Sequence, residues 1–179
     1  NGKIYIYPSH DLDQVMLSND NGDQYNMEDY HVLSLDNFNS PCVDHGEVLH
    51  VKDVPWATKQ MWAPDAAFKN NKYYLYFPAR DQQDNFRIGV AVSDSPAGPF
   101  TPEKDFIPGS FSIDPAVFVD DDGKAYMYYG GLWGGQLEKW TTGSFNPNGK
   151  EPAATKPALG PMVAEMSDDM LTFKETPSE

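Results

Sequence analysis

The chain has 179 residues and a formal net charge of -14, because 27 Asp and Glu residues outnumber 13 Lys and Arg residues. Binding to nucleic-acid phosphates needs a basic surface, so this balance argues against a nucleic-acid partner. Hydrophobic residues make up 40% of the chain and aromatic residues 13%, which argues against disorder. The length is sufficient for one domain with a sizeable core. No apolar run approaches the roughly 18 residues of a membrane span.

Three runs of the chain are alike, and each predicts a tight turn followed by an aromatic strand. They are residues 1–8 (NGKIYIYP), 70–78 (NNKYYLYFP) and 122–129 (DGKAYMYY). Asn-Gly, Asn-Asn and Asp-Gly suit the positive φ values of a two-residue β-hairpin. Fifteen prolines and fourteen glycines punctuate the chain, residues 11–28 are mostly polar and predict a loop, and no long segment has helical periodicity. The pattern is typical of an all-β protein with short strands.

The second and third runs each follow a strand that begins with Asp beside Pro. These strands are residues 62–68 (WAPDAAF) and 112–118 (SIDPAVF). The repeating unit is therefore an acidic strand start, a hairpin, an aromatic strand and two further strands, with a spacing of a few tens of residues. A radial array of four-stranded blades, a β-propeller, fits this repeat better than a β-sandwich, which would not need the same Asp in successive units.

The repeat also predicts how much of a propeller the chain contains. Residues 1–179 would form a partial propeller domain of roughly two and a half to three blades: the first blade without its first strand, the second blade and most of the third. Since a propeller needs at least about four blades to close, we expect the remaining blades of the same protein to be partners of this part.

The acidic strand starts predict a shared funnel at the propeller axis. The start of a blade's first strand lies beside the end of its second strand. We therefore expect Asp65 near Arg80 and Asp81, and Asp114 near residues 130–133. Carboxylates that converge there could carry out general acid–base chemistry on a bound polar substrate. A structural interpretation stays open, because an Asp before a strand often accepts hydrogen bonds from nearby backbone N–H groups.

Two further groups of residues are expected at the same face. His10 and Asp11 close the second strand of the first blade, although a lone His is more often a hydrogen-bonded structural residue than a base or ligand. Trp62 and Trp133 flank the two Asp positions, and an indole can stack on the apolar face of a sugar ring. A Trp in an aromatic-rich β protein is also commonly a core residue.

No motif in the sequence requires a metal or a cofactor. Cys42 is the only cysteine, which excludes an internal disulfide and a zinc site built from cysteine pairs. We expect it to be a small buried residue. Residues 120–123 (DDDG) lack the alternating ligands and the distal Glu of an EF-hand, so a hairpin turn explains them better.

Taken together, these motifs resemble glycoside hydrolase family 43. The resemblance rests on Trp62-Ala63-Pro64-Asp65 followed by Lys72-Tyr73-Tyr74-Leu75-Tyr76, and on Ser112-Ile113-Asp114-Pro115 followed by the Asp-Gly-Lys hairpin. Residues 5–11 and 163–171 also resemble the family. The resemblance implies a five-bladed β-propeller that hydrolyses plant-type glycans, commonly β-xylosides or α-L-arabinofuranosides, with inversion at the anomeric carbon.

The resemblance assigns one of the family's three carboxylates to this chain. Asp114 takes the role of the Asp that orients the general acid and raises its pKa, since a neighbouring negative charge disfavours ionisation. The general base would lie on the strand before Lys3 and the general acid on a fourth blade beyond Glu179. Glu165 and Glu175 do not fill that place, because they fall in outer strands of the third blade. The candidate substrate-binding residues are Trp62, Asp65, His10, Asp11, Arg80 and Trp133.

The implied partner is an oligosaccharide or polysaccharide substrate. Such substrates lie outside the cytoplasm, so we expect an extracytoplasmic location: secreted, periplasmic or at the cell surface. Family members sometimes hold calcium on the axis, and calcium stays possible in the complete propeller, although no ligand set in this chain demands it. An alternative of a different class is a non-catalytic carbohydrate-binding propeller, with a lectin site made by Trp62, Trp133 and Asp65.

Overall fold

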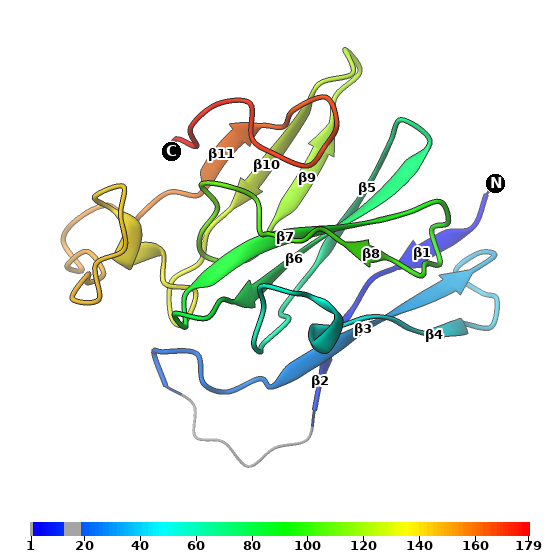
Figure 1. Ribbon diagram of the computed structural model, residues 1–179, viewed down its shortest axis with the longest axis horizontal. Coiled ribbons are helices and arrows are strands. Elements are labelled where there is room, and N and C mark those ends of the chain that lie inside the picture. The colour runs from blue at the N-terminus through cyan, green and yellow to red at the C-terminus, as the bar shows by residue number, and fades with distance from the viewer. Residues whose placement is uncertain (1, 13–18) are drawn as a thin grey trace.

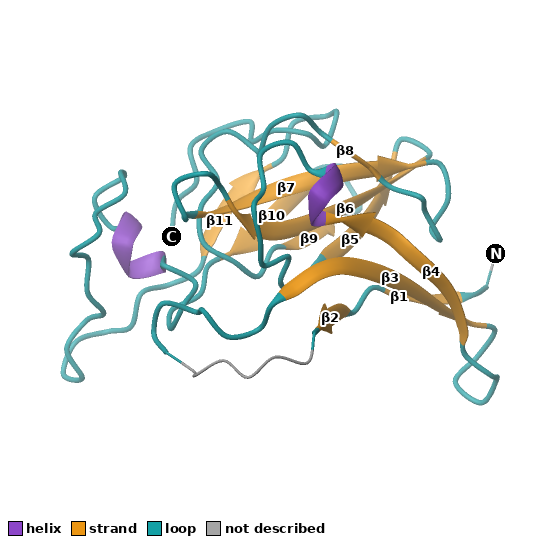
Figure 2. Cartoon of the chain, turned by 60° about the horizontal axis from the view of Figure 1, so that its bottom comes forward, coloured by secondary structure: helices purple, strands orange, loops and turns teal. Residues whose placement is uncertain are grey.

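Three antiparallel sheets follow one another along the chain and fan out beside each other (Figure 1). The computed structural model describes residues 2–12 and 19–179. In this described part, helix is limited to two short 3-10 segments, η1 (Val51–Asp53) and η2 (Leu137–Trp140), and the rest is strand, turn and loop (Figure 2). The all-β prediction is confirmed. None of the described helices is long and apolar enough to cross a membrane.

The first sheet contains one interrupted strand, a central strand and an outer strand. β1 and β2 pair with successive parts of β3, with Ile4 opposite Leu35 and Ser9 opposite Tyr30, and β4 pairs along the other edge of β3. The interpretation of this sheet as a first blade without its first strand stays a prediction. The strands are β1 (Ile4–Ile6), β2 (Ser9–Asp11), β3 (Met27–Leu35) and β4 (Val43–His50).

The second sheet is a complete four-stranded meander in the order β5-β6-β7-β8. Its first hairpin turns at Asn70 and Asn71, which have φ values of 53° and 58°, so the predicted two-residue turn is confirmed. Asparagine tolerates this left-handed conformation better than most residues. The strands are β5 (Asp65–Lys69), β6 (Lys72–Arg80), β7 (Phe86–Ser93) and β8 (Thr101–Pro102).

The third sheet has the order β9-β10-β11, with β9 (Ala116–Val119), β10 (Ala125–Tyr129) and β11 (Met162–Glu165). Its hairpin is wider than the two-residue turn expected at Asp-Gly. The Asp120 N–H donates to the Lys124 carbonyl at 2.7 Å, and Gly123 takes a φ of 83° inside this loop. An isolated bridge between Val163 and Ser178 continues the sheet beyond β11.

Packing between neighbouring sheets explains why β6 is apolar along almost its whole length. Leu75, Phe77 and Ala79 belong to a core cluster shared with the first sheet, whereas Tyr74 and Tyr76 belong to a second cluster shared with the third sheet. Successive side chains of a strand point to opposite faces, so the second sheet is buried on both faces. A sandwich of two sheets would leave one face of each sheet solvated.

The outer faces of the first and third sheets remain open in this part of the protein. Ile6 is exposed on the outer face of the first sheet, and Phe118 and Tyr128 on that of the third. Large apolar side chains on a regular sheet face indicate a surface that another layer covers, which agrees with further blades on both sides. This arrangement confirms the prediction of a partial propeller.

Cys42 is exposed, so the expectation that it is buried was wrong. It lies just before β4, at the end of a solvent-exposed turn in which even Phe38 is 87% exposed. The apolar neighbours Pro41 and Val43 suggested burial, but all three residues are exposed where the turn leads into β4. Short apolar runs in turns are therefore a poor indicator of burial.

Close packing of the second blade predicts a large effect of Gly89→Ala. A Cβ at Gly89 would lie 2.5 Å from the Trp56 ring and 2.8 Å from the Phe77 ring, and these rings stack at 5.9 Å. We expect the free energy of unfolding to fall by about 1–3 kcal/mol, because an overpacked core must shift its rings. Urea denaturation measures this change.

Gly160→Ala is the matched control, because a Cβ there would meet nothing closer than 3.9 Å. Its free energy of unfolding should stay within about 0.5 kcal/mol of the wild-type value. Equal stability of Gly89→Ala and wild type would contradict the packing of the second blade.

Candidate active site

Asp114 lies two residues before β9, in a segment that is hydrogen-bonded to the residues just after β10. Its φ is 59°, a left-handed conformation that Asp tolerates. The Gly130 N–H donates to the Ile113 carbonyl at 2.8 Å, and the Ser112 hydroxyl accepts from the Gly131 N–H at 2.9 Å. The start of the third blade's first strand is thus held against the end of its second, and the backbone fixes where Asp114 can point.

Gly131 makes room for Asp114. A Cβ at Gly131 would lie 2.7 Å from a side-chain carbon of Ile113 and 3.4 Å from an Asp114 carboxylate oxygen. The Asp114 side chain reaches solvent, while the protein around it displaces part of its hydration and raises its pKa above the usual value. Partial desolvation strengthens the field that this carboxylate exerts on a nearby group.

Asp65 joins the second blade to the third. It begins β5, and its Oδ2 accepts a hydrogen bond from the Val117 N–H at 2.6 Å. The two acidic strand starts are therefore neighbours, as expected for blades around one axis. Because its carboxylate is used by the backbone of β9, Asp65 has the structural role that was kept open for it, and its assignment to substrate binding stays a prediction.

The expectation that Asp65 lies beside Arg80 and Asp81 was wrong. Asp65, the first residue of β5, pairs with Tyr76. β6 then continues beyond this first residue of β5, and its Arg80 bridges to Lys59. The spacing in the sequence predicted the correct strand pair. It did not predict that β6 continues beyond this pair, where Arg80 is bridged to Lys59 in the segment before β5.

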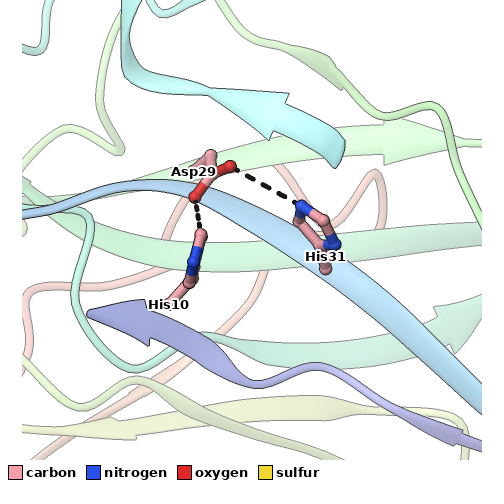
Figure 3. A group of neighbouring side chains, drawn as sticks. All are labelled: His10, Asp29 and His31. Atoms are coloured by element: carbon pink, nitrogen blue, oxygen red, sulfur yellow. Dashed lines mark hydrogen bonds and ion pairs between the residues drawn. The ribbon is translucent and has the colours of Figure 1, made fainter. Parts of the chain in front are cut away.

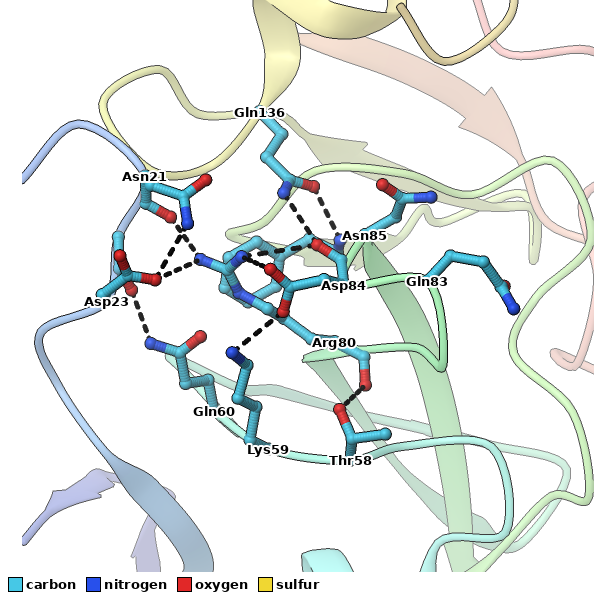
Figure 4. Close-up of polar contacts among 12 residues, drawn as sticks. Asn21, Asp23, Thr58, Lys59, Gln60, Arg80, Gln83, Asp84, Asn85 and Gln136 are labelled. Atoms are coloured by element: carbon cyan, nitrogen blue, oxygen red, sulfur yellow. Dashed lines mark hydrogen bonds and ion pairs between the residues drawn. The ribbon is translucent and has the colours of Figure 1, made fainter. Parts of the chain in front are cut away.

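Arg80 is fully buried and cross-links three loops (Figure 4). Its guanidinium donates to Asp84 Oδ2 at 3.0 Å and to the Asn21 carbonyl, and lies 4.7 Å from the centroid of the Phe86 ring. Desolvation lowers its pKa, and Asp84 and Asp23 partly offset this. With no exposed surface, Arg80 positions loops at this end of the blades, and its assignment to direct sugar binding stays a prediction that its burial does not favour.

Two glutamines, Gln60 and Gln136, complete this network. No motif in the sequence indicated them. Gln136 accepts from the Phe86 N–H at 2.8 Å and donates to the Asp84 carbonyl at 3.0 Å. Gln60 donates to the carbonyls of Gly22 and Gln24. Both are buried. They tie residues 19–26 and 131–136 to the end of β6, so loops of all three sheets are fixed relative to Asp114.

The two tryptophans lie in different environments. Trp62 is 8% exposed, its ring packs 4.7 Å from Phe86, and its indole N–H donates to the Tyr25 carbonyl at 2.9 Å. These contacts give it the core role that was its alternative interpretation. Trp133 is 72% exposed on the loop that follows Gly131, so its ring is available for stacking on a ligand.

His10 and Asp11 are exposed at the end of the first sheet. The His10 ring does not point to Asp114 but donates through Nδ1 to Asp29 at 2.5 Å, beside His31 (Figure 3). Asp11 ends β2 and pairs with Met27 through the backbone. Their roles in substrate binding stay predictions.

A cavity of about 840 Å³ opens away from these residues. Arg87, Phe111 and Trp140 line part of it, and it includes neither Asp114 nor any of the predicted substrate-binding residues. A pocket on a propeller axis is walled by every blade. The part of the chain described here supplies only one side of such a pocket, which explains why the candidate residues do not enclose a cavity of their own.

Comparison with known protein families decides the identity of this fold. The model of Glycosyl hydrolases family 43 matches residues 4–177. The chain belongs to glycoside hydrolase family 43. The match covers almost the entire chain and confirms the resemblance seen in the acidic strand starts.

Curated family 43 relatives are similar over nearly the whole chain. Xylosidase/arabinosidase 43A of Humicola insolens is 61% identical, with 98% of this chain and 56% of the relative covered. A xylosidase/arabinosidase of Bacteroides ovatus is 51% identical, with 98% and 54% covered. The chain therefore spans about half the length of the relatives that it matches.

Solved family 43 structures have the same fold. CoXyl43, a β-xylosidase/α-arabinofuranosidase from a compost microbial metagenome, in complex with xylotriose and in calcium-free form, superposes with a TM-score of 0.95. It is 59% identical, with 100% of this chain and 56% of that chain covered. A Xanthomonas citri enzyme in complex with xylotriose gives a TM-score of 0.91 at 49% identity, with 100% and 51% covered.

The described residues do not offer calcium a matching set of acidic ligands. In residues 2–12 and 19–179, the one group of three potential metal-ligating side chains is His10, Asp29 and His31. Calcium takes six to eight oxygen ligands, and two of these three residues offer nitrogen. Calcium on the axis of the complete propeller stays a prediction.

The burial of Arg80 predicts that Arg80→Met is strongly destabilising. The substitution leaves the Asn21 carbonyl and the Asp84 carboxylate without the guanidinium, so we expect a loss of about 3–5 kcal/mol in the free energy of unfolding. Lys59→Met is the matched control, because Lys59 pairs with the same Asp84 at 2.9 Å but is 44% exposed; it should cost less than about 1 kcal/mol. Urea denaturation distinguishes the two, and equal losses would contradict the network.

The raised pKa of Asp114 predicts a pH-dependent gain from Asp114→Asn. Folding disfavours the ionised form, so the contribution of Asp114 to stability is most favourable below the unfolded pKa, near 3.8, and becomes less favourable as pH rises through the folded pKa. At pH 7 the variant, which also tolerates a positive φ, should be more stable than wild type. The difference should vanish as pH falls below about 3.8.

Thermal unfolding across pH 3–8 measures this difference. Asp168→Asn is the control, because the Asp168 side chain is 93% exposed, and it should leave the pH profile unchanged. A lower stability of Asp114→Asn than of wild type at pH 7 would show that Asp114 is stabilised by a partner instead of desolvated.

Proposed function

We propose that the whole protein is an inverting glycosidase that hydrolyses β-xylosides or α-L-arabinofuranosides. The observation that carries the proposal is the position of Asp114, held by a left-handed backbone at the inner start of the third blade with a raised pKa. Family membership and relatives named xylosidase/arabinosidase support it. Since the chain spans about half of those relatives, the activity belongs to the complete propeller.

Asp114 would act on the general acid and not on the sugar bond itself. An inverting glycosidase protonates the leaving oxygen with one carboxylic acid and activates water with another, about 6.5–9.5 Å away. A third, ionised carboxylate beside the acid disfavours its ionisation and so keeps it protonated. The resemblance assigns the acid and base to segments outside residues 1–179, and Asp114 to the third role.

Two observations favour an enzyme over the non-catalytic sugar-binding alternative. That alternative needs Trp62, Asp65 and Trp133 to face a ligand together. Trp62 is instead packed in the core, and the Asp65 carboxylate is bound to the backbone of β9. Trp133 alone stays exposed, and one aromatic ring does not make a specific sugar site.

The substrate and location follow from this proposal. The complexes of CoXyl43 and of the Xanthomonas citri enzyme with xylotriose support an oligosaccharide with xylose units as a ligand, on which Trp133 would stack. Because plant glycans lie outside the cytoplasm, we propose an extracytoplasmic location. Calcium on the axis would be a structural or charge-balancing ion of the complete propeller.

Asp114→Asn in the whole protein should lower kcat on an aryl xyloside or arabinofuranoside by about 100- to 1,000-fold, within the range of acid–base contributions. Binding of xylotriose should change little, because the amide keeps the shape of the carboxyl group. Release of the aryl group and calorimetric titration of xylotriose measure the two effects.

Glu165→Gln is the control. Glu165 pairs with Lys174 at 3.0 Å on β11, the outer strand of the third sheet, so kcat should stay within about twofold of wild type. A wild-type kcat for Asp114→Asn would remove Asp114 from the mechanism, and absence of turnover by the wild-type whole protein would overturn the proposed function.

A further inference from the structure

A chain of alternating carboxylate and imidazole groups lies on the first blade, at the end where β2 and β3 meet (Figure 3). The His10 Nδ1 donates to Asp29 Oδ1 at 2.5 Å, and His31 Nε2 lies 3.7 Å from Asp29 Oδ2. Potential ligand atoms of His10, Asp29 and His31 all lie within 4.8 Å of one another. The group belongs to neither the Asp114 site nor the Arg80 network.

The hydrogen bond made by Nδ1 of His31 determines whether its Nε2 carries a proton or a lone pair. Its Nδ1 donates to Asp44 Oδ1 on β4 at 3.0 Å. A neutral imidazole carries one N–H, so a proton on Nδ1 leaves a lone pair on Nε2. This lone pair faces a carboxylate oxygen, which is also an acceptor. Two acceptors turned toward each other are stable only with a cation between them, either a proton or a metal ion.

The distances suit a metal ion. An ion with bonds of about 2.0–2.1 Å to nitrogen and oxygen places tetrahedral ligands about 3.4 Å apart, close to the 3.7 Å between His31 Nε2 and Asp29 Oδ2. His10 stands on the three-residue strand β2 and is 46% exposed, so its ring can turn from the hydrogen bond to the ion. Carboxylate-bound histidines such as His31 are typical of metal ligands.

The charges around the group also favour a cation. The Asp29 side chain is 13% exposed, and its contacts among the described residues are with the two imidazoles and not with Lys or Arg. Asp44 adds a second carboxylate, which accepts hydrogen bonds from the Gly46 N–H and from His31. A partly buried carboxylate with no Lys or Arg among its described neighbours gains from a bound cation.

We propose that His10, Asp29 and His31 bind one divalent transition-metal ion of the zinc type, with Asp44 orienting His31. Two imidazoles and one carboxylate suit zinc, cobalt, nickel or iron, and not calcium. The ion would hold the short strand β2 against β3. Without the ion, β2 pairs with β3 only in an irregular register.

Cobalt is the probe, because its visible absorption reports coordination by nitrogen and oxygen ligands. The whole protein, stripped with a chelator, is titrated with Co²⁺. Wild type should bind one more equivalent than His31→Gln or His10→Gln, or bind at least 10-fold more tightly. Zn²⁺ should displace this cobalt, whereas excess Ca²⁺ should not. Asp44→Asn should keep the stoichiometry and weaken binding by about 10-fold or more.

His45→Gln is the matched control. His45 lies on the same sheet and hydrogen-bonds to Ser34 at 2.8 Å, but it does not belong to the group, so its cobalt binding should equal that of wild type. Circular dichroism establishes that each variant is folded, and His10→Gln, at an exposed edge, is the variant least able to disturb the fold. Identical cobalt binding by wild type, His10→Gln and His31→Gln would overturn the proposal, as would equal loss in His45→Gln.

Discussion

The hydrogen bond from the Val117 N–H to Asp65 Oδ2 is the contact on which the site geometry depends. It joins the first strands of two successive blades where they approach the axis, and its 2.6 Å length is that of a bond to a charged acceptor. Such bonds contribute about 1.5–3 kcal/mol. Because Val117 follows Asp114 by three residues in the same segment, the bond that joins the blades also sets the position of the catalytic candidate.

Packing makes this local bond part of a rigid frame. The second sheet is buried on both faces, by Leu75 and Phe77 toward the first sheet and by Tyr74 and Tyr76 toward the third. Loops at one end of the blades are then fixed by Arg80, Gln60 and Gln136. A catalytic carboxylate needs positioning within a fraction of an ångström, and here rigid strands supply most of it.

The sequence predicted the blades because their signals are local. Aromatic strands after Asn-Asn and Asp-Gly turns depend on a few adjacent residues, and Asp114 beside Gly131 follows from antiparallel pairing alone. Arg80 was beyond prediction, since its burial depends on the Asn21 carbonyl, 59 residues away. Trp62 was ambiguous for the same reason: its partners, Phe86 and the Tyr25 carbonyl, come from other elements.

Only part of the histidine group on the first blade could be predicted from the sequence. Asp29 and His31 are two residues apart on a strand, which puts them on one face. Their partners His10 and Asp44 come from β2 and β4, and both pairings contain register shifts that no spacing rule anticipates. Bulges re-aim side chains, and the register that they create is visible only in the folded sheet.

The most direct test of this account is a crystal structure of the whole protein, carrying Asp114→Asn, with xylotriose bound. The saccharide should lie at the inner ends of β5 and β9, with an oxygen of its scissile bond on the same side of the propeller as residue 114. A saccharide bound at the opposite end of the blades, or blades two and three closed as a two-layer sandwich, would contradict it.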